Sequence, residues 1–145
     1  MMNDVAWQRE HSVEADASLS FAWSYLTDVK NWSDPLAEFA LDGPFAPGSH
    51  GATRMPGQEP VTWHIGDVQA GQSYTIETEL PGATLSFRWS FDAVSDRSTR
   101  LTQRIVLAGS NTAAYVSEKE SFGANLQAGM EKIAATIATA AARVG

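Results

Sequence analysis

The sequence lacks cysteine and is poor in basic residues. The absence of cysteine excludes disulfide scaffolds, thiolate zinc sites and thiol nucleophiles. Lysine and arginine total 10 against 17 aspartates and glutamates, which gives a formal net charge of −7. Because nucleic-acid binding depends on clustered lysine and arginine, we expect no nucleic-acid partner. The same negative charge opposes the long-range approach of strongly anionic ligands.

Long hydrophobic runs are also absent. The longest charge-free, apolar-rich run near the C-terminus lies between Lys132 and Arg143. It is about half as long as the ~20 residues that a helix needs to cross a bilayer. Residues 1–10 do not show the cationic start and apolar stretch of a secretory signal peptide. We therefore expect a cytoplasmic protein that does not insert into a membrane.

The composition that remains is that of a globular protein, with 43% hydrophobic and 19% charged residues. A domain usually contains roughly 100–200 residues, so we expect residues 1–145 to form one domain. A chain of this length buries about 68–70% of its unfolded surface, and it therefore needs neither a disulfide nor a metal to fold.

The N-terminal part of the chain predicts a strand followed by a short helix. Residues 7–14 alternate between a wholly polar face and a second face that carries Arg9 and His11. Ser18 is a typical N-cap, and apolar residues at helical spacing predict a helix over residues 19–28. Residues 31–35 predict a turn or a second short helix that ends at a proline.

The middle of the chain predicts an antiparallel sheet with one solvent-exposed face. Short segments with apolar residues on one face only are separated by turns rich in glycine and proline. With the first strand they make about seven strands. The six further segments are residues 37–41, 51–55, 61–65, 74–80, 85–91 and 101–107.

A long helix is predicted to close the chain. Residues 117–120 fit a capping box, and the helix is expected to run to about Arg143. About 27 residues at ~1.5 Å each give roughly 40 Å, which is enough to cross a whole sheet. One apolar stripe follows its length, made by Phe122, Leu126, Met130, Ile133, Ile137, Ala141 and Val144.

Several segments carry a resemblance to a known superfamily. Residues 11–18 lead into a helix with Trp23 and a closing Asp28, and Trp32 follows. Residues 98–102 read Ser-Thr-Arg-Leu-Thr, as in a last strand, and residues 122–130 begin the terminal helix. The chain thereby resembles the START-like (SRPBCC) superfamily, and within it the polyketide cyclase/dehydrase and lipid-transport group of small bacterial proteins.

The resemblance implies an α+β helix-grip fold. In this fold a curved antiparallel sheet of about six to seven strands wraps around a long C-terminal helix, with short helices after the first strand. The main structural rival is a nuclear-transport-factor-like cone fold. Such folds open with long helices, whereas this chain opens with a strand. The fold hosts carriers, cyclases and co-chaperone domains, so it does not define one function.

A curved sheet around one helix is expected to leave a cavity between them, although the same residues can also fill an ordinary core. The inward positions are rich in aromatic side chains, which suits an apolar or aromatic small molecule. The expected ligand-binding residues are Trp7, Arg9, His11, Trp63, Tyr74, Phe87, Trp89, Gln103, Phe122, Leu126 and Met130.

A few polar residues stand out among these inward positions. Arg9 and His11, with Gln103 near them, are expected to orient a ligand carbonyl or hydroxyl, unless Arg9 extends to solvent instead. His11 is a candidate general acid or base, and Tyr74 is a candidate donor to an enolate-like oxygen. Trp32 is a candidate lid residue, or alternatively a plug at the edge of the core.

No metal or cofactor is expected. No two of the histidines His11, His50 and His64 have the close helical or hairpin spacing of metal motifs, and His64 is expected to face away from His11. The sequence contains no Ser/His/Asp signature and no glycine-rich phosphate loop.

Three functions remain open. The preferred one is binding or carriage of a hydrophobic, lipid- or polyketide-like molecule. The first alternative is a cyclase or dehydratase, acting as a lyase or isomerase in the same cavity. The second is a co-chaperone-like interaction module, which predicts a filled core and an exposed apolar patch. The alanine-rich face of the last helix allows either a monomer or a homodimer.

Overall fold

The computed structural model describes residues 5–32, 38–111 and 115–144 of the chain. Strand β1 (Val5–Ala15) leads into helix α1 (Leu19–Leu26) and the short 3₁₀ helix η1 (Val29–Asn31). The predicted cap of α1 is confirmed, because the Ser18 hydroxyl accepts a hydrogen bond of 3.1 Å from the Phe21 backbone N–H. Most of the turn predicted at residues 31–35 lies outside the described residues.

Six strands follow in the order in which the sequence predicts them. They are β2 (Glu38–Asp42), β3 (His50–Arg54), β4 (Val61–Gln69), β5 (Ser73–Leu80), β6 (Ala83–Ser95) and β7 (Ser98–Ala108). All neighbouring pairs are antiparallel and form one seven-stranded sheet in the order β1-β7-β6-β5-β4-β3-β2. The first and last strands of the chain are therefore neighbours.

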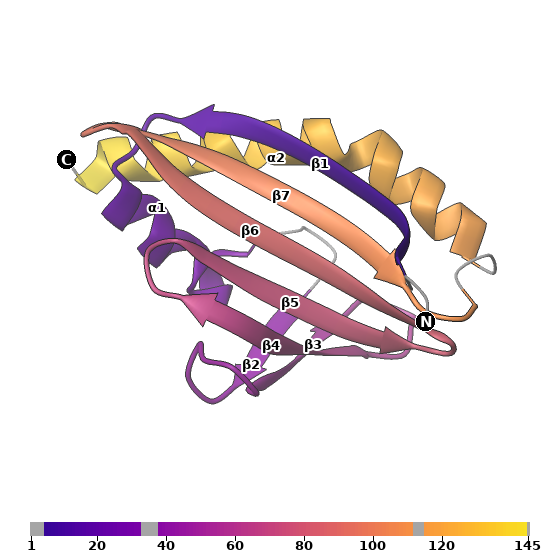
Figure 1. Cartoon of the computed structure of the whole chain (residues 1–145). Coiled ribbons are helices and arrows are strands. Elements are labelled where there is room, and N and C mark those ends of the chain that lie inside the picture. The colour runs from indigo at the N-terminus through magenta and orange to yellow at the C-terminus, as the bar shows by residue number, and fades with distance from the viewer. Residues whose placement is uncertain (1–4, 33–37, 112–114, 145) are drawn as a thin grey trace.

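The chain closes with helix α2 (Val116–Val144), which has 29 residues and begins one residue before the predicted capping box. It runs along the length of the sheet and packs mainly against β1 (Figure 1). The expected helix-grip fold is thereby confirmed. No helix within the described ranges is both long and apolar enough to cross a membrane.

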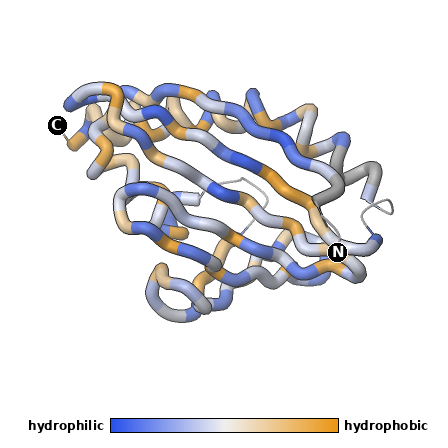
Figure 2. The backbone as a smooth tube through the Cα atoms, viewed as in Figure 1, coloured by the Kyte–Doolittle hydropathy of each residue, from blue (hydrophilic) through white to orange (hydrophobic). Residues whose placement is uncertain are grey.

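Alternation along the strands separates the core from solvent, as Figure 2 shows by the change between hydrophilic and hydrophobic positions. On the outer face, Arg104 forms an ion pair of 3.1 Å with Glu10 on the neighbouring strand. On the inner face, Ile65 and Leu101 have no measurable exposure, and neither does Ile137 of α2, which belongs to the same core. This one-sided pattern explains why apolar residues recur at every second position in the sequence.

Candidate functional site

A cavity of about 670 Å³ lies between the inner face of the sheet, the segment from α1 to η1, and helix α2. Most of its wall is apolar or aromatic. The lining residues are Tyr25, Leu26, Asn31, Trp32, Phe39, Thr53, Val61, Trp63, Tyr74, Ile76, Thr78, Leu80, Leu85, Phe87, Trp89, Gln103, Tyr115, Phe122, Lys132, Ile133 and Thr136.

The sheet supplies its part of the wall by alternation. On β5 the inward positions Tyr74, Ile76 and Thr78 are buried, while the intervening Thr75 and Glu77 are more exposed. The ring of Phe87 on β6 meets Phe122 of α2 edge to face, with the ring centroids 5.6 Å apart. Of the predicted ligand-binding residues, the wall contains Trp63, Tyr74, Phe87, Trp89, Gln103 and Phe122.

Trp32 stands at the centre of an aromatic cluster in this wall. Its ring centroid lies 5.7 Å from Phe39, 6.4 Å from Phe45 and 5.5 Å from Trp63. Its indole N–H donates a hydrogen bond of 2.8 Å to the backbone carbonyl of Leu26. These contacts fix the side chain from several sides, so Trp32 forms part of the wall and not a freely moving lid.

Gly51 makes room for the indole of Trp63. A Cβ atom on Gly51 would lie 2.3 Å from the Trp63 ring, which is closer than any side chain tolerates. The indole N–H of Trp63 donates a hydrogen bond of 3.1 Å to the Thr53 hydroxyl. Trp63 is thus held against the backbone of β3, and glycine is needed at position 51 for that contact.

Tyr74 is the most buried ionisable group of the wall, with a relative exposure of 1%. Burial raises the pKa of its hydroxyl far above the ordinary value, because the phenolate would lose its hydration. The hydroxyl donates a long hydrogen bond of 3.4 Å to the Leu26 carbonyl, which also accepts from Trp32. Tyr74 is therefore a neutral donor and not a base.

The structure separates the first strand from the cavity, contrary to our expectation. Helix α2 lines the cavity through Ile133 and Thr136, and it lines a second, open groove beside β1 through Ala135 and Ala138. The groove has a volume of about 590 Å³ and contains His11. Because the helix borders both spaces, it stands between them. The expectation that β1 lines the same cavity as Gln103 was wrong.

Arg9 and Trp7 also lie outside the cavity. The Arg9 side chain is exposed, its guanidinium carbon lies 5.2 Å from the centre of the Trp7 ring, and it donates a hydrogen bond of 3.0 Å to the Gln8 carbonyl. The cost of burying an unpaired guanidinium explains this outward path. His11 is the direct strand partner of Gln103, as expected for the first and last strands. Of these two strand partners, Gln103 lines the cavity and His11 does not.

Leu126 and Met130 are inward-facing residues that do not border open space. Their relative exposures are 9% and 1%, and they belong to the packed core. Neither lines the cavity. The apolar stripe of α2 predicts burial for these residues, but it does not distinguish a position that meets other side chains from one that meets a void.

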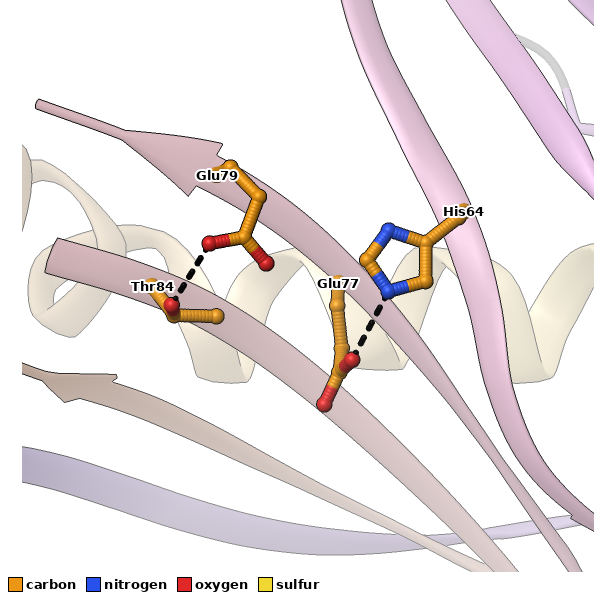
Figure 3. Close-up of polar contacts among 4 residues, drawn as sticks. All are labelled: His64, Glu77, Glu79 and Thr84. Atoms are coloured by element: carbon orange, nitrogen blue, oxygen red, sulfur yellow. Dashed lines mark hydrogen bonds and ion pairs between the residues drawn. The ribbon is translucent and has the colours of Figure 1, made fainter. Parts of the chain in front are cut away.

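Two of the histidines are neighbours in space. His50 and His64 are paired across β3 and β4, and their ring centroids are 6.2 Å apart. The Nε2 atom of His64 lies 2.9 Å from a carboxylate oxygen of Glu77 (Figure 3). The sequence spacing of the two histidines does not indicate this proximity, because it arises from the register of β3 and β4. Among the described residues, no group of three or more His, Cys, Asp or Glu has the arrangement of a metal site.

Most polar residues of the wall are not indicated by the sequence patterns described above. Thr53 and Thr78 occupy inward positions of their strands, so alternation is the signal that indicates them. Lys132 is polar and does not lie at the three- and four-residue spacing of the apolar stripe, so the stripe does not indicate it. Asn31 and Tyr115 lie beside connecting segments, for which no periodic signal exists.

Comparison with known proteins identifies the family of this sequence. Residues 6–138 match the family model described as polyketide cyclase/dehydrase and lipid transport. A search of curated protein sequences finds no match. The solved structures that resemble the chain have low sequence identity to it, so they establish the fold alone.

Three of these structures illustrate the kinds of protein that share the fold. Norcoclaurine synthase from Thalictrum flavum, in complex with dopamine and hydroxybenzaldehyde, has a TM-score of 0.68 at 14% identity, over 90% of this chain and 86% of that one. An aromatase/cyclase from Streptomyces sp. R1128 has a TM-score of 0.68 at 16% identity, over 96% of each chain. A START superfamily protein from Mycobacterium smegmatis has a TM-score of 0.69 at 12% identity, over 95% and 99%.

Proposed function

The chain belongs to the polyketide cyclase/dehydrase and lipid transport family, and on this premise we propose that it binds a small apolar or aromatic molecule between its sheet and helix α2. The observation that carries the proposal is the cavity of about 670 Å³ with its aromatic wall. Ligand sites in proteins commonly measure about 300–1,000 Å³ and combine apolar walls with a few polar groups. The complex of norcoclaurine synthase with dopamine and hydroxybenzaldehyde supports an aromatic ligand.

The wall favours rings over a flexible chain as the ligand body. Phe87 and Trp89 are carried by one strand, and Trp63 and Trp32 stand near each other, with ring centroids 5.5 Å apart. An aromatic pair contributes about 0.5–1.5 kcal/mol beyond the burial of its apolar area. A planar ligand that stacks on these side chains gains both the aromatic pairing energy and the burial of its apolar area.

Binding is better supported than acid–base catalysis. No histidine and no carboxylate lines the cavity in the part of the chain that the structure describes. His11, one of our two catalytic candidates, lies in the groove beyond α2. Tyr74 remains a neutral donor whose proton is directed at the Leu26 carbonyl. A cyclase or dehydratase in this cavity would have to use tyrosine hydroxyls and Lys132.

The distribution of exposed apolar side chains argues against the interaction module. Within the described ranges, the exposed large hydrophobic residues are Val61, Val94 and Val144. They lie on β4, β6 and the end of α2. An interface usually needs a contiguous apolar patch of a few hundred Å² or more, which single valines do not supply.

The experiment uses 2-naphthamide, a neutral bicyclic aromatic probe, and isothermal titration calorimetry. We expect saturable binding to the wild-type chain. Thr136→Trp fills the cavity from α2 and should weaken binding by about tenfold or more, because overpacking costs about 1–3 kcal/mol. Absence of measurable binding to the wild-type chain would contradict the proposal.

The matched control is Thr139→Trp. Thr136 and Thr139 lie on the same helix, and the hydroxyl of each donates a hydrogen bond to the carbonyl four residues earlier, at 2.9 Å and 3.0 Å. Thr139 is exposed and does not line the cavity. Its replacement should leave the affinity unchanged, and an equal loss in both variants would mean that the probe binds elsewhere.

A further inference from the structure

Lys132 on helix α2 is the only charged residue that lines the cavity in the described part of the chain. No aspartate, glutamate or arginine shares this wall. Lys132 is an exposed residue at the border of the cavity, and the other lining residues are aromatic, aliphatic or uncharged polar. A single charge at such a place is a feature that neither the family description nor the proposed apolar binding explains.

Lys132 has no carboxylate partner among the described residues. The ion pairs of 4.0 Å or less link His64 to Glu77, Arg100 to Glu14 and Arg104 to Glu10, on or near the outer face of the sheet. Helical neighbours three and four positions from Lys132 are Ala128, Gly129, Ala135 and Thr136, none of which is acidic.

The adjacent acidic residue does not compensate Lys132. Glu131 precedes it, but successive helical residues point in different directions. The Glu131 carboxylate lies 3.2 Å from the amide nitrogen of Gln127, which donates to it. Glu131 and Gln127 both border the groove on the other side of α2. The ammonium group of Lys132 thus has no carboxylate partner among the described residues.

A second polar group of the wall is open to a ligand. Gln103 on β7 lines the cavity, and no hydrogen bond of its side-chain amide to another described residue is present. Some other polar groups of the wall are already bonded: Tyr115 donates to the Pro81 carbonyl at 2.6 Å, and Asn31 donates to the Tyr25 carbonyl at 3.0 Å. The cavity therefore offers the cation of Lys132 and, among its uncharged polar groups, the amide of Gln103.

We propose that the ligand is an apolar carboxylate, whose rings occupy the aromatic part of the cavity and whose carboxylate pairs with the ammonium group of Lys132. This inference rests on the proposed function and narrows it to one chemical class. An ionised carboxylate enters a low-polarity site only with a partner of opposite charge. The net charge of −7 repels anions at long range, so a single local cation selects ligands with one negative charge over those with several.

The test compares two probes with the same ring system. 2-Naphthoate carries a carboxylate, and 2-naphthamide replaces it with a neutral amide of similar size. We expect naphthoate to bind the wild-type chain about tenfold more tightly, as for a hydrogen bond to a charged group. Lys132→Met should remove this preference, so that the two probes bind the variant about equally, while Lys132→Arg should retain most of it.

The control for charge is Arg143→Met, a replacement in the last turn of the same helix. It removes one positive charge from an exposed residue, as Lys132→Met does, but Arg143 does not line the cavity. The preference for naphthoate should persist in this variant. Equal wild-type affinities for the two probes, or a preference that survives Lys132→Met, would overturn the carboxylate assignment alone. Failure of both probes to bind would overturn the proposed function as well.

Discussion

The inner face of the sheet has a packed half and an open half. In the packed half, α2 lies against β1, and residues such as Leu101, Met130 and Ile137 have exposures of 1% or less. In the open half, the inward side chains of β4 to β6 border a cavity of about 670 Å³. Alternation along the strands is the same in both halves. The position of the long helix determines which inward residues pack against other side chains and which line the cavity.

The difference between the halves has a simple physical origin. One helix is too narrow to cover a strongly curved sheet of seven strands, since a helix with its side chains is only about 10–12 Å wide. Rigid aromatic residues such as Trp32, Trp63 and Phe45 then support one another around the uncovered part. A wall that is fixed by its own contacts does not collapse into the space beside it.

The largest expected change in the free energy of unfolding is for one of two isoleucines on α2. Ile137 is wholly buried in the packed half, whereas Ile133 is half-buried and lines the cavity. Ile137→Ala should lower the free energy of unfolding by about 2–5 kcal/mol. Ile133→Ala should cost only about 1–2 kcal/mol, because its side chain already lacks partners on one side. Urea unfolding measures both, and equal losses would mean that the two halves are packed alike.

The next prediction concerns the wall of the open half. Gly51→Ala places a methyl group 2.3 Å from the Trp63 ring, and it should destabilise the fold by about 1–3 kcal/mol. The displaced indole should also weaken the binding of 2-naphthamide. The control is Gly129→Ala on α2, where a Cβ meets nothing within 4 Å and should stabilise the helix by about 0.5–1 kcal/mol. An unchanged stability in Gly51→Ala would show that Trp63 is loosely held.

Tyr74 gives a prediction for alkaline pH. Burial raises its pKa in the folded state, whereas the unfolded chain ionises near the ordinary value of about 10. The contribution of Tyr74 to stability is therefore complete below about pH 10 and falls by up to ~1.4 kcal/mol per pH unit above it. Tyr74→Phe should lose stability less steeply between neutral and alkaline pH. Parallel slopes for the two proteins in urea unfolding would contradict this account.

The smallest effect is expected on the outer face. His64 and Glu77 are joined at 2.9 Å, with side-chain exposures of 29% and 34% (Figure 3). A partly exposed pair contributes about 0–1 kcal/mol, so His64→Gln should change the unfolding free energy by no more than that. The affinity for 2-naphthamide should not change, because His64 faces away from the cavity. A marked loss of affinity would mean that the outer face takes part in binding.

Sequence patterns predicted the fold because local signals agreed with one another. One-sided alternation located all seven strands, Ser18 marked the start of α1, and the stripe of α2 defined a helix as long as the sheet. Strand alternation, a helix cap and a helical stripe are properties of neighbouring residues in the sequence. They can therefore be recognised without knowing which helices and strands pack together.

The candidate site could be predicted only in part, because its boundary depends on packing. Alternation correctly directed Trp63, Phe87 and Gln103 inward, and they line the cavity. It gave His11 the same direction, yet α2 stands between His11 and that space. No local signal states where a helix crosses a sheet. The pairing of His50 with His64 was likewise hidden, since it follows from the register of β3 and β4.

His11 was predicted to line the cavity and does not, whereas Lys132 lines the cavity and was not predicted. Its charge and its position outside the spacing of the apolar stripe of α2 gave no sign that it borders the same cavity as Ile133. A long side chain can cover apolar surface with its methylene groups and still bring its charge to a distant point. Binary patterns of polar and apolar residues do not represent this property.

A crystal structure of the protein with 2-naphthoate tests the central claim most directly. The account predicts density for the naphthalene rings in the open half, near Trp63 and Phe87, with the carboxylate beside the ammonium group of Lys132. The packed half should remain unchanged, with Met130 and Ile137 in place. Density for the probe in the groove beside β1, or side chains that fill the cavity and leave no room for the probe, would contradict it.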